Sequence, residues 1–365
     1  MDPAEHLPVE LVRRIIELAA AATTDDRRWR RLAKLNTLFR SLALVNHAWE
    51  EASRPYLYAE ITLKEEPQAN SLVQTVDHHP DRAALVKKLD ISYDPFGEDE
   101  GWRKSIVLYV LSRCVNLSEL RHCGEGDWSS TWDAVLAKSS LHTLKLRWIT
   151  FTGLSTTFPS LRALSLTVVT LPQDIKSFSK SFPGLIEFSI TFGADVLFES
   201  EAREPSNLHF VVAMAPQLVT LRLENGTAGI PLSLLQHLII IGIHLQRIDS
   251  TIISDYKLPP PPLPPRFDPA ELPSLELRFI LHSWISEHML LTDPLPPQQR
   301  LLALFESRDA GVVEAISALR RVKRVVLEPW LVERFPEGIN HAVEKLKEKE
   351  LELEFDSLDS FYVNE

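Results

Sequence analysis

The spacing of apolar residues changes along the chain and divides it into two parts. Up to about residue 57, apolar side chains recur at helical spacing, with one face toward a core. Pro8 fits the first position of the first helix, where a missing N–H leaves no hydrogen bond unmade. We expect the helical part to end at Pro55 and a strand to follow over residues 58–63. The helical stripes are Leu11, Val12, Ile15, Ile16 and Ala19, then Leu35, Leu38, Leu42, Val45 and Trp49.

After residue 63 the pattern Leu-x-x-Leu-x-Leu recurs with conservative exchanges. Clear copies begin at Val86, Leu141, Leu161, Leu185, Leu218 and Val322, and weaker ones at Leu117, Leu245, Leu275 and Leu351. From Leu117, successive copies begin 24, 20, 24, 33 and 27 residues further on. Leucine-rich repeats have periods of about 20–29 residues, so the pattern predicts such repeats with some insertions.

Several repeats combine a helical stretch with a short strand. Helical spacing precedes strands over residues 106–111, 132–136 and 208–212, and prolines follow at 159, 183 and 216. Such units bury a continuous core only when they stack, so we expect an α/β solenoid with a curved parallel sheet. An ordinary α/β domain with leucine-rich strands is the alternative. The regular spacing and the lack of a glycine-rich phosphate turn favour the solenoid.

These patterns divide the chain into three parts. Residues 1–63 form a helical module, residues 64–356 the repeats and residues 357–365 a tail. The most apolar stretch, residues 232–245, is only 14 residues long, so we expect a core segment and no membrane contact. The first residues, MDPAEHLPVE, have no basic start and no apolar run, so no secretory signal is expected.

Composition narrows the partners and the compartment. A net charge of −11 repels phosphate backbones and argues against nucleic-acid binding. The only cysteines, Cys114 and Cys123, form no disulfide framework, so a reducing compartment, cytoplasm or nucleus, is expected. Their spacing does not suit a structural zinc site, and we expect no metal and no cofactor. No catalytic signature for hydrolase or nucleotide chemistry is present.

Two segments carry possible secondary contacts. Residues 259–265 read PPPPLPP and precede Arg266, which matches a polyproline ligand for a Pro-recognition domain. The alternative is a stiff surface loop over residues 259–269. The basic run Arg27–Arg31 favours a solvated helix face, with an acidic partner as the alternative.

Residues 1–63 resemble the F-box family in its fungal form, which combines an F-box with leucine-rich repeats. The resemblance rests on LPVELVRRII at residues 7–16, SLALVNHAW at residues 41–49 and RPYLY at residues 54–58. It implies a three-helix module that binds a Skp-type adaptor, through which the chain joins a cullin scaffold while the repeats hold a substrate. The chain departs from the family in about a dozen extra residues, 21–34, which we interpret as a helical insertion that loops outward.

A three-helix module of this size buries little surface and is expected to leave an apolar patch for a partner. The alternative is that about half of the apolar residues form the module's own core, which we expect for Ile16 and Leu44 and leave open for Leu42. The candidate adaptor-binding residues are Leu7, Pro8, Leu11, Ile15, Leu42, Val45 and Trp49.

A substrate would meet the middle residues of the Leu-x-Leu strands, which alternate away from the core. These candidates are Lys145, Ser165, Ser189, Arg222 and Asp249.

The resemblance thus implies a non-catalytic substrate receptor of an SCF-type (Skp–cullin–F-box) ubiquitin ligase. The alternative is a leucine-rich-repeat scaffold with a degenerate F-box. A hydrolase or transferase on an α/β fold is a third reading, with no motif to support it.

Overall fold

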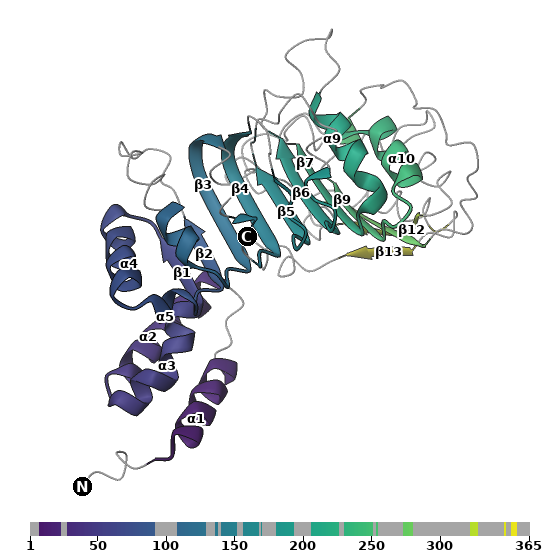
Figure 1. Cartoon of the computed structure of the whole chain (residues 1–365). Helices are drawn as coiled ribbons and strands as arrows, with labels where there is room; N and C mark the ends of the chain where they lie inside the picture. The colour runs from purple at the N-terminus through teal and green to yellow at the C-terminus, as the bar shows by residue number, and fades with distance from the viewer. Residues whose placement is uncertain are drawn as a thin grey trace, which may run out of the picture. The chain divides into compact units, whose positions relative to one another are not determined.

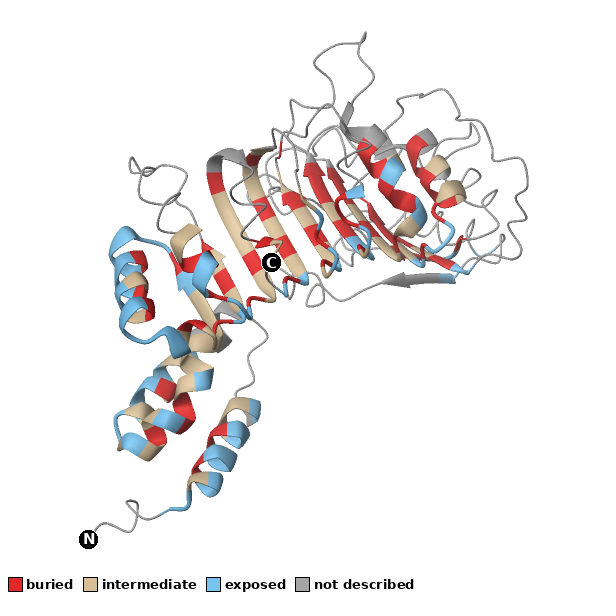
Figure 2. Ribbon diagram, viewed as in Figure 1, coloured by how far each residue is buried: buried red, intermediate tan, exposed pale blue. Residues whose placement is uncertain are grey.

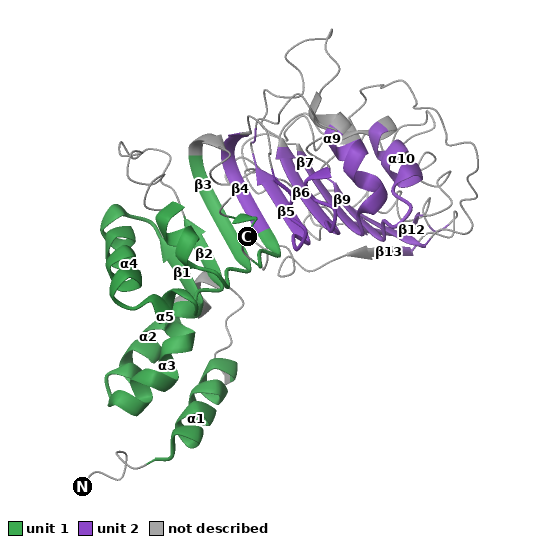
Figure 3. Ribbon diagram, viewed as in Figure 1, with its two compact units in different colours: residues 1–124, 131–143, 359–365 green, residues 125–130, 144–358 purple. Residues whose placement is uncertain are grey.

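The computed structural model describes residues 7–22, 28–91, 108–128, 136–137, 140–151, 156–167, 169, 180–192, 206–225, 230–250, 253–254, 273–279, 322–327, 347 and 352–355. The chain divides into two compact units (Figure 3). Unit 1 comprises residues 1–124, 131–143 and 359–365, and unit 2 comprises residues 125–130 and 144–358. Both units combine helices with parallel strands, so the fold is of the α/β type (Figure 1).

Unit 1 begins with three helices, and its strands follow (Figure 1). Residues 108–113 are also helical, and residues 119–124 of β3 belong to this unit. The elements are α1 (Val9–Ala22), α2 (Arg28–Ala43), α3 (His47–Ala59), β1 (Glu60–Leu63), α4 (Glu66–His78), α5 (Pro80–Ala83), β2 (Lys88–Ile91) and β3 (Glu119–Trp128).

The three helices share a small apolar core. Its buried members are Val12, Ile16, Phe39, Trp49 and Ala52, with Ala20, Leu35, Leu42, Tyr56 and Leu57 packed against them. The ring of Phe39 on α2 stacks on that of Tyr56 on α3, with 5.0 Å between centroids. Helices α1 and α2 thus both pack against α3.

Two expected boundaries in this module were wrong. Helix α3 does not end at Pro55 but continues through it to Ala59. A proline inside a helix loses one hydrogen bond, and packing of the flanking Tyr56 and Leu57 against the core offsets that cost. Helix α1 begins at Val9, one residue after Pro8. Helix α2 begins at Arg28, so the second half of the expected insertion is continuous with the second apolar stripe.

The strands of unit 1 are parallel, in the order β1-β2-β3. A repeated turn links them, in which one carbonyl accepts from amides of the next repeat. Ala59 O accepts from Lys87 N at 3.0 Å, Lys87 O from Ser118 N at 2.8 Å and Ser118 O from His142 N at 2.8 Å. Successive repeats therefore enter their strands at the same register.

Unit 2 continues the same plan over more repeats. Its strand order is β4-β5-β6-β7-β9-β11-β12-β13, which is also their order in the chain, and every pairing described between β5 and β13 is parallel. A separate parallel pair joins β8 and β10. The elements are β4 (Thr143–Phe151), β5 (Ala163–Thr167), β6 (Glu187–Phe192), α9 (Ser206–Met214), the 3-10 helix η2 (Ala215–Gln217), β7 (Thr220–Asn225), β8 (Ile230–Pro231), α10 (Leu232–Ile241), β9 (Arg247–Ser250), β10 (Ile253–Ser254), β11 (Leu275–Phe279), β12 (Val322–Leu327) and β13 (Glu352–Phe355).

Alternate residues of these strands are buried, as the colours of Figure 2 show. On β6, Phe188 and Ile190 point inward, and Phe188 meets Phe210 of α9 edge-to-face at 5.2 Å. Phe158 and Phe182, each three residues before the first leucine of its repeat, stack at 5.6 Å. The apolar stretch at residues 232–245 forms buried α10 and the turn after it, as expected.

All ten copies of the leucine pattern coincide with strands β2, β3, β4, β5, β6, β7, β9, β11, β12 and β13. The prediction of parallel α/β units is confirmed to that extent. Among the described residues, no helix has the length and apolar character needed to cross a membrane.

Candidate protein-docking surfaces

Helix α1 is apolar on two of its faces. Val12 and Ile16 are buried in the module core, whereas Leu11 and Leu18 are 51% and 54% exposed. Leu7 and Ile15 are exposed as well, so four aliphatic side chains follow one another at spacings of four, four and three residues. This spacing places Leu11, Ile15 and Leu18 along one side of α1, and Leu7 lies two residues before the helix begins. We call Leu7, Leu11, Ile15 and Leu18 the α1 stripe.

The local sequence explains how α1 starts and what surrounds the stripe. The carbonyl of Pro8 accepts from Leu11 N at 2.9 Å and from Val12 N at 3.1 Å, which closes the first turn. Between the aliphatic positions lie exposed charged residues, among them Arg14 and Glu17, whose side chains pair at 3.0 Å. An apolar strip with a charged border is typical of protein-binding surfaces.

A second exposed apolar site lies in the turn between α2 and α3. Leu44 is 86% exposed and Val45 52% exposed. Asn46 ends this turn: its Oδ1 accepts from Trp49 N at 3.2 Å and caps α3. We expected Leu44 in the core, and that expectation was wrong. The turn carries Leu44 past the end of α2, where its side chain meets solvent.

Two other candidates lie in or against the core. Trp49 was expected to be an open docking side chain. It is only 9% exposed and belongs to the buried cluster, so that expectation was wrong. Its Nε1 is buried and has no hydrogen-bond partner among the residues that the structure describes. Leu42 is half-buried and packs against the same cluster, in agreement with the alternative that it serves the fold. Ile16 is fully buried, as expected.

The structure thus separates the seven adaptor-binding candidates by exposure. It leaves Leu7, Pro8, Leu11, Ile15 and Val45 open, and it adds Leu18 and Leu44, which the sequence interpretation missed. Leu18 continues the stripe at ordinary helical spacing, so the signal for it was present in the sequence.

Four of the five substrate-binding candidates fall in one row of the sheet of unit 2. Ser165 pairs in register with Ser189, Ser189 with Arg222 and Arg222 with Asp249. The three residues before Asp249 in this row are half-buried. Lys145 on β4 is also half-buried. Parallel register therefore brings four residues, separated by 24 to 33 positions in the chain, onto one sheet face.

Asp249 differs from the other members of the row because it is only 4% exposed. Arg247, two residues earlier on the same strand, binds it through Nε and Nη2, both at 2.7 Å. The guanidinium covers the carboxylate, so Asp249 does not present a free charge to a partner. Asp249 was expected to face outward with an open side chain, and instead it is buried beneath Arg247.

The same arrangement recurs on the neighbouring strands. Arg222 pairs with Glu224, and the hydroxyl of Thr191 donates to Glu224 Oε2 at 3.2 Å. Arg278 pairs with Glu276, which also accepts from Arg324 Nη1 at 3.0 Å across β11 and β12. Opposite charges two residues apart in Arg-x-Glu, Arg-x-Asp and Glu-x-Arg are the sequence signal for these pairs. They make this part of the outward face charge-compensated.

Residues 259–269, proposed to bind a Pro-recognition domain, lie outside the described residues, as do the side chains of residues 27–31. Cys114 is buried, and burial raises the pKa of its thiol to about 12, which keeps it protonated and unreactive at neutral pH.

The chain matches no protein-family model, and no curated protein matches it at a significant level.

Proposed function

We propose that the chain is the substrate-recognition subunit of an SCF-type ubiquitin ligase. The α1–α3 module binds a Skp-type adaptor, which links it to a cullin, and the strand units hold a protein substrate. The α1 stripe is the observation that carries the proposal, because it leaves four aliphatic side chains in solvent within a module that resembles an F-box.

The energetics favour a protein partner at this surface. Burying one aliphatic side chain contributes about 1.5–3 kcal/mol, so the α1 stripe represents a substantial unused driving force. The stripe is on a different face of α1 from Val12 and Ile16, so a partner can cover it without opening the core. Leu44 and Val45 add apolar surface to the same module.

The strand units support the second half of the proposal. In-register parallel strands and the repeated turn hydrogen bonds favour an irregular leucine-rich-repeat solenoid with a curved sheet. Its outward face would carry substrate contacts at Lys145, Ser165, Ser189 and Arg222. Asp249 would act only through Arg247, by holding the guanidinium in place.

The subunit catalyses no step itself in this proposal. It increases the effective concentration of a substrate lysine near a ubiquitin-loaded enzyme, which is a proximity effect. This role places the chain in the cytoplasm or the nucleus.

The test is complex formation by purified components. The full chain is co-expressed with a recombinant Skp-type adaptor and then mixed with the matching cullin. Size-exclusion chromatography is expected to show a complex of chain, adaptor and cullin. If the folded chain elutes alone at micromolar concentrations of each partner, the ligase proposal fails, and a scaffold with a degenerate F-box becomes the better explanation.

A further inference from the structure

The helical module α1–α3 passes directly into the first strand, β1, without a linker. Helix α3 ends at Ala59, and Glu60 is both its C-terminal cap and the first residue of β1. The carbonyl of Ala59 accepts from Lys87 N at 3.0 Å, just as Lys87 O accepts from Ser118 N. The last residue of the third helix therefore takes the position in the turn ladder that a turn residue takes in later repeats.

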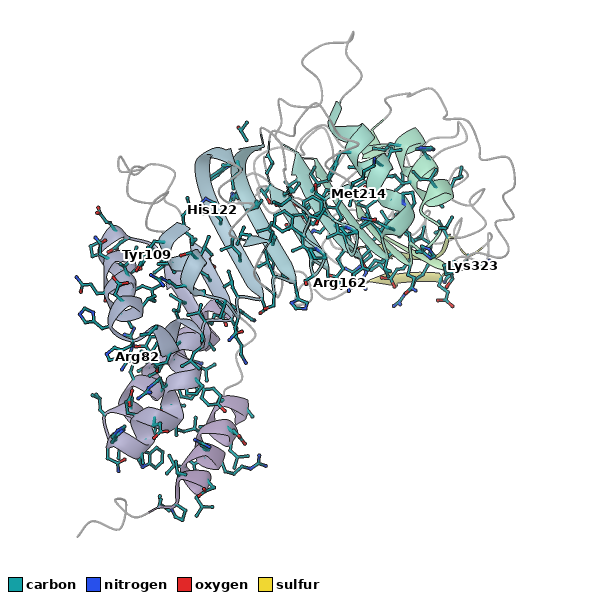
Figure 4. The ribbon with its side chains drawn as sticks, in the orientation of Figure 1. Arg82, Tyr109, His122, Arg162, Met214 and Lys323 are labelled. Carbon is teal, nitrogen blue, oxygen red and sulfur yellow. The ribbon has the colours of Figure 1, made fainter. Side chains whose placement is uncertain are left out.

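Polar side chains reinforce this junction between α3 and α5. Arg54 donates from Nε and Nη2 to the two carboxylate oxygens of Glu50, at 3.1 and 2.7 Å. Its Nη1 also lies 3.8 Å from Asp81 at the start of α5. On α5, Arg82 donates to the hydroxyl of Tyr58 at 3.0 Å and lies over its ring, 5.5 Å from the centroid. We call Glu50, Arg54, Tyr58, Asp81 and Arg82 the α3–α5 clamp; Figure 4 labels Arg82 within it.

The geometry of the clamp restricts rotation as well as distance. Arg54 and Tyr58 are four residues apart, so they lie on the same side of α3. Each contacts a different residue of α5, and a guanidinium held by a two-oxygen fork has a fixed plane. Two contacts at successive turns of the helix oppose a twist of α3 about its own axis. Because Arg54 and Glu50 are partly exposed, the clamp contributes more to orientation than to the free energy of unfolding.

We propose that the clamp and the α3–β1 continuity make α1–α3 and the first two strands one rigid body. Arg54 and Arg82 are then positioning residues: through α3, which packs on α1, they set the direction of the α1 stripe relative to β1 and β2. This inference rests on the proposed function only for its use, which is to hold a docked adaptor in a defined direction. The rigidity itself is a property of the chain alone.

The test measures a distance distribution within unit 1. Nitroxide labels are placed on exposed positions of α2 and α4 by Arg40→Cys and Ser71→Cys, with Cys123→Ser to remove the more accessible native thiol. Buried Cys114 remains unlabelled. Pulsed electron–electron double resonance on the full chain is expected to give one narrow distribution of distances between the two labels. The double variant Arg54→Ala with Arg82→Ala is expected to broaden it.

Controls separate orientation from folding and from docking. Arg14→Ala removes an exposed pair within α1 and is expected to leave the distribution narrow. Arg54→Lys keeps the charge but loses the planar fork, so it should broaden the distribution less than the double variant does. If the double variant does not fold, Arg54→Lys replaces it as the test variant. A distribution that stays narrow in folded Arg54→Ala with Arg82→Ala, or a broad one in the unaltered chain, overturns the inference. Adaptor binding, measured on the same proteins, reports separately on the proposed function.

Discussion

Leu11 and Val12 are consecutive residues of α1 with opposite environments. Leu11 is half exposed on the α1 stripe, whereas Val12 is buried against α3 in the module core. Adjacent positions of one helix therefore separate two roles, contact with a partner and support of the fold. Substitutions at these two positions distinguish docking from stability within the same turn.

Leu11→Asp combined with Ile15→Asp is expected to abolish adaptor binding. A carboxylate placed in an apolar interface must lose its hydration without a partner, which costs several kcal/mol. Both positions are exposed in the free chain, so the free energy of unfolding should change by only about 0.5 kcal/mol per site. Calorimetry measures the affinity for the adaptor, and chemical denaturation of the same sample measures the free energy of unfolding.

Val12→Ala is the matched control. It removes two buried methyl groups and is expected to lower the free energy of unfolding by about 2 kcal/mol while the folded fraction still binds adaptor. Retained binding by the double Asp variant would remove the α1 stripe from the docking surface. Loss of stability in that variant equal to that in Val12→Ala would show that the stripe serves the fold.

Phe188 links β6 to α9, and its loss should weaken unit 2. Phe188→Ala deletes a buried ring that meets Phe210 edge-to-face, so we expect about 3–5 kcal/mol of destabilisation. Ser189→Ala, one residue further on the outward face, should stay within about 0.5 kcal/mol of the unaltered chain. Urea denaturation followed by tryptophan fluorescence measures both. Equal effects at the two positions would contradict the assignment of inward and outward faces.

Much of the fold was readable from the sequence because its core is periodic. The spacing of leucines at i, i+3 and i+5 predicted strands just after Leu161, Leu185 and Leu218, and β5, β6 and β7 each begin two residues after these leucines. The end of α3 was not readable, because proline usually stops a helix, whereas here tertiary packing by Tyr56 and Leu57 overrides that preference. The β8–β10 pair also escaped prediction, since two-residue strands leave no periodic pattern.

The candidate surfaces were predicted less well, for a physical reason. A helical pattern shows that Leu11, Val12, Ile15 and Ile16 are apolar, but it does not tell which face of a two-sided helix meets its own chain. Trp49 shows the same limit: a large aromatic residue satisfies both a core and an interface, and only its packing on α1 and α2 decides. Asp249 was placed in the correct row, but its cover by Arg247 depends on side-chain conformation.

Asp249→Asn tests the buried part of the charged face. The substitution keeps the shape but removes the charge that holds the Arg247 guanidinium, so we expect a loss of about 1–3 kcal/mol in the free energy of unfolding. Glu17→Gln breaks the exposed pair with Arg14 and should cost less than about 0.5 kcal/mol. Chemical denaturation of both variants at low and high salt measures the difference. An equally small effect at Asp249 would mean that the pair is as solvated as the one on α1.

Gly242 is required by the turn after α10. A Cβ atom at this position would lie 2.8 Å from the carbonyl oxygen of Leu238 and would overlap the side chain of Leu245. Gly242→Ala is therefore expected to destabilise the chain by about 1–3 kcal/mol, because Leu245 is buried and α10 cannot easily shift. Ile243→Ala, at the exposed next position, is the control and should have little effect. Equal melting temperatures for the two variants in thermal denaturation would show that the turn adapts to a side chain at this position.

The α3–α5 clamp should weaken in acid. The hydrogen bond from Arg54 holds the pKa of Glu50 below its ordinary value of 4.5. A carboxyl with a lowered pKa in the folded state adds stability above its unfolded pKa, and this stability is lost as pH falls through the folded pKa. The unaltered chain should therefore have a higher melting temperature than Glu50→Gln near neutral pH. That advantage should shrink as the pH falls below about 4.5, the ordinary pKa of Glu50, toward about pH 3. Melting temperatures of both proteins across this range, with Glu17→Gln as the exposed control, test the sign. An advantage of the unaltered chain that grows toward low pH would show that the Glu50–Arg54 pair does not stabilise the folded state.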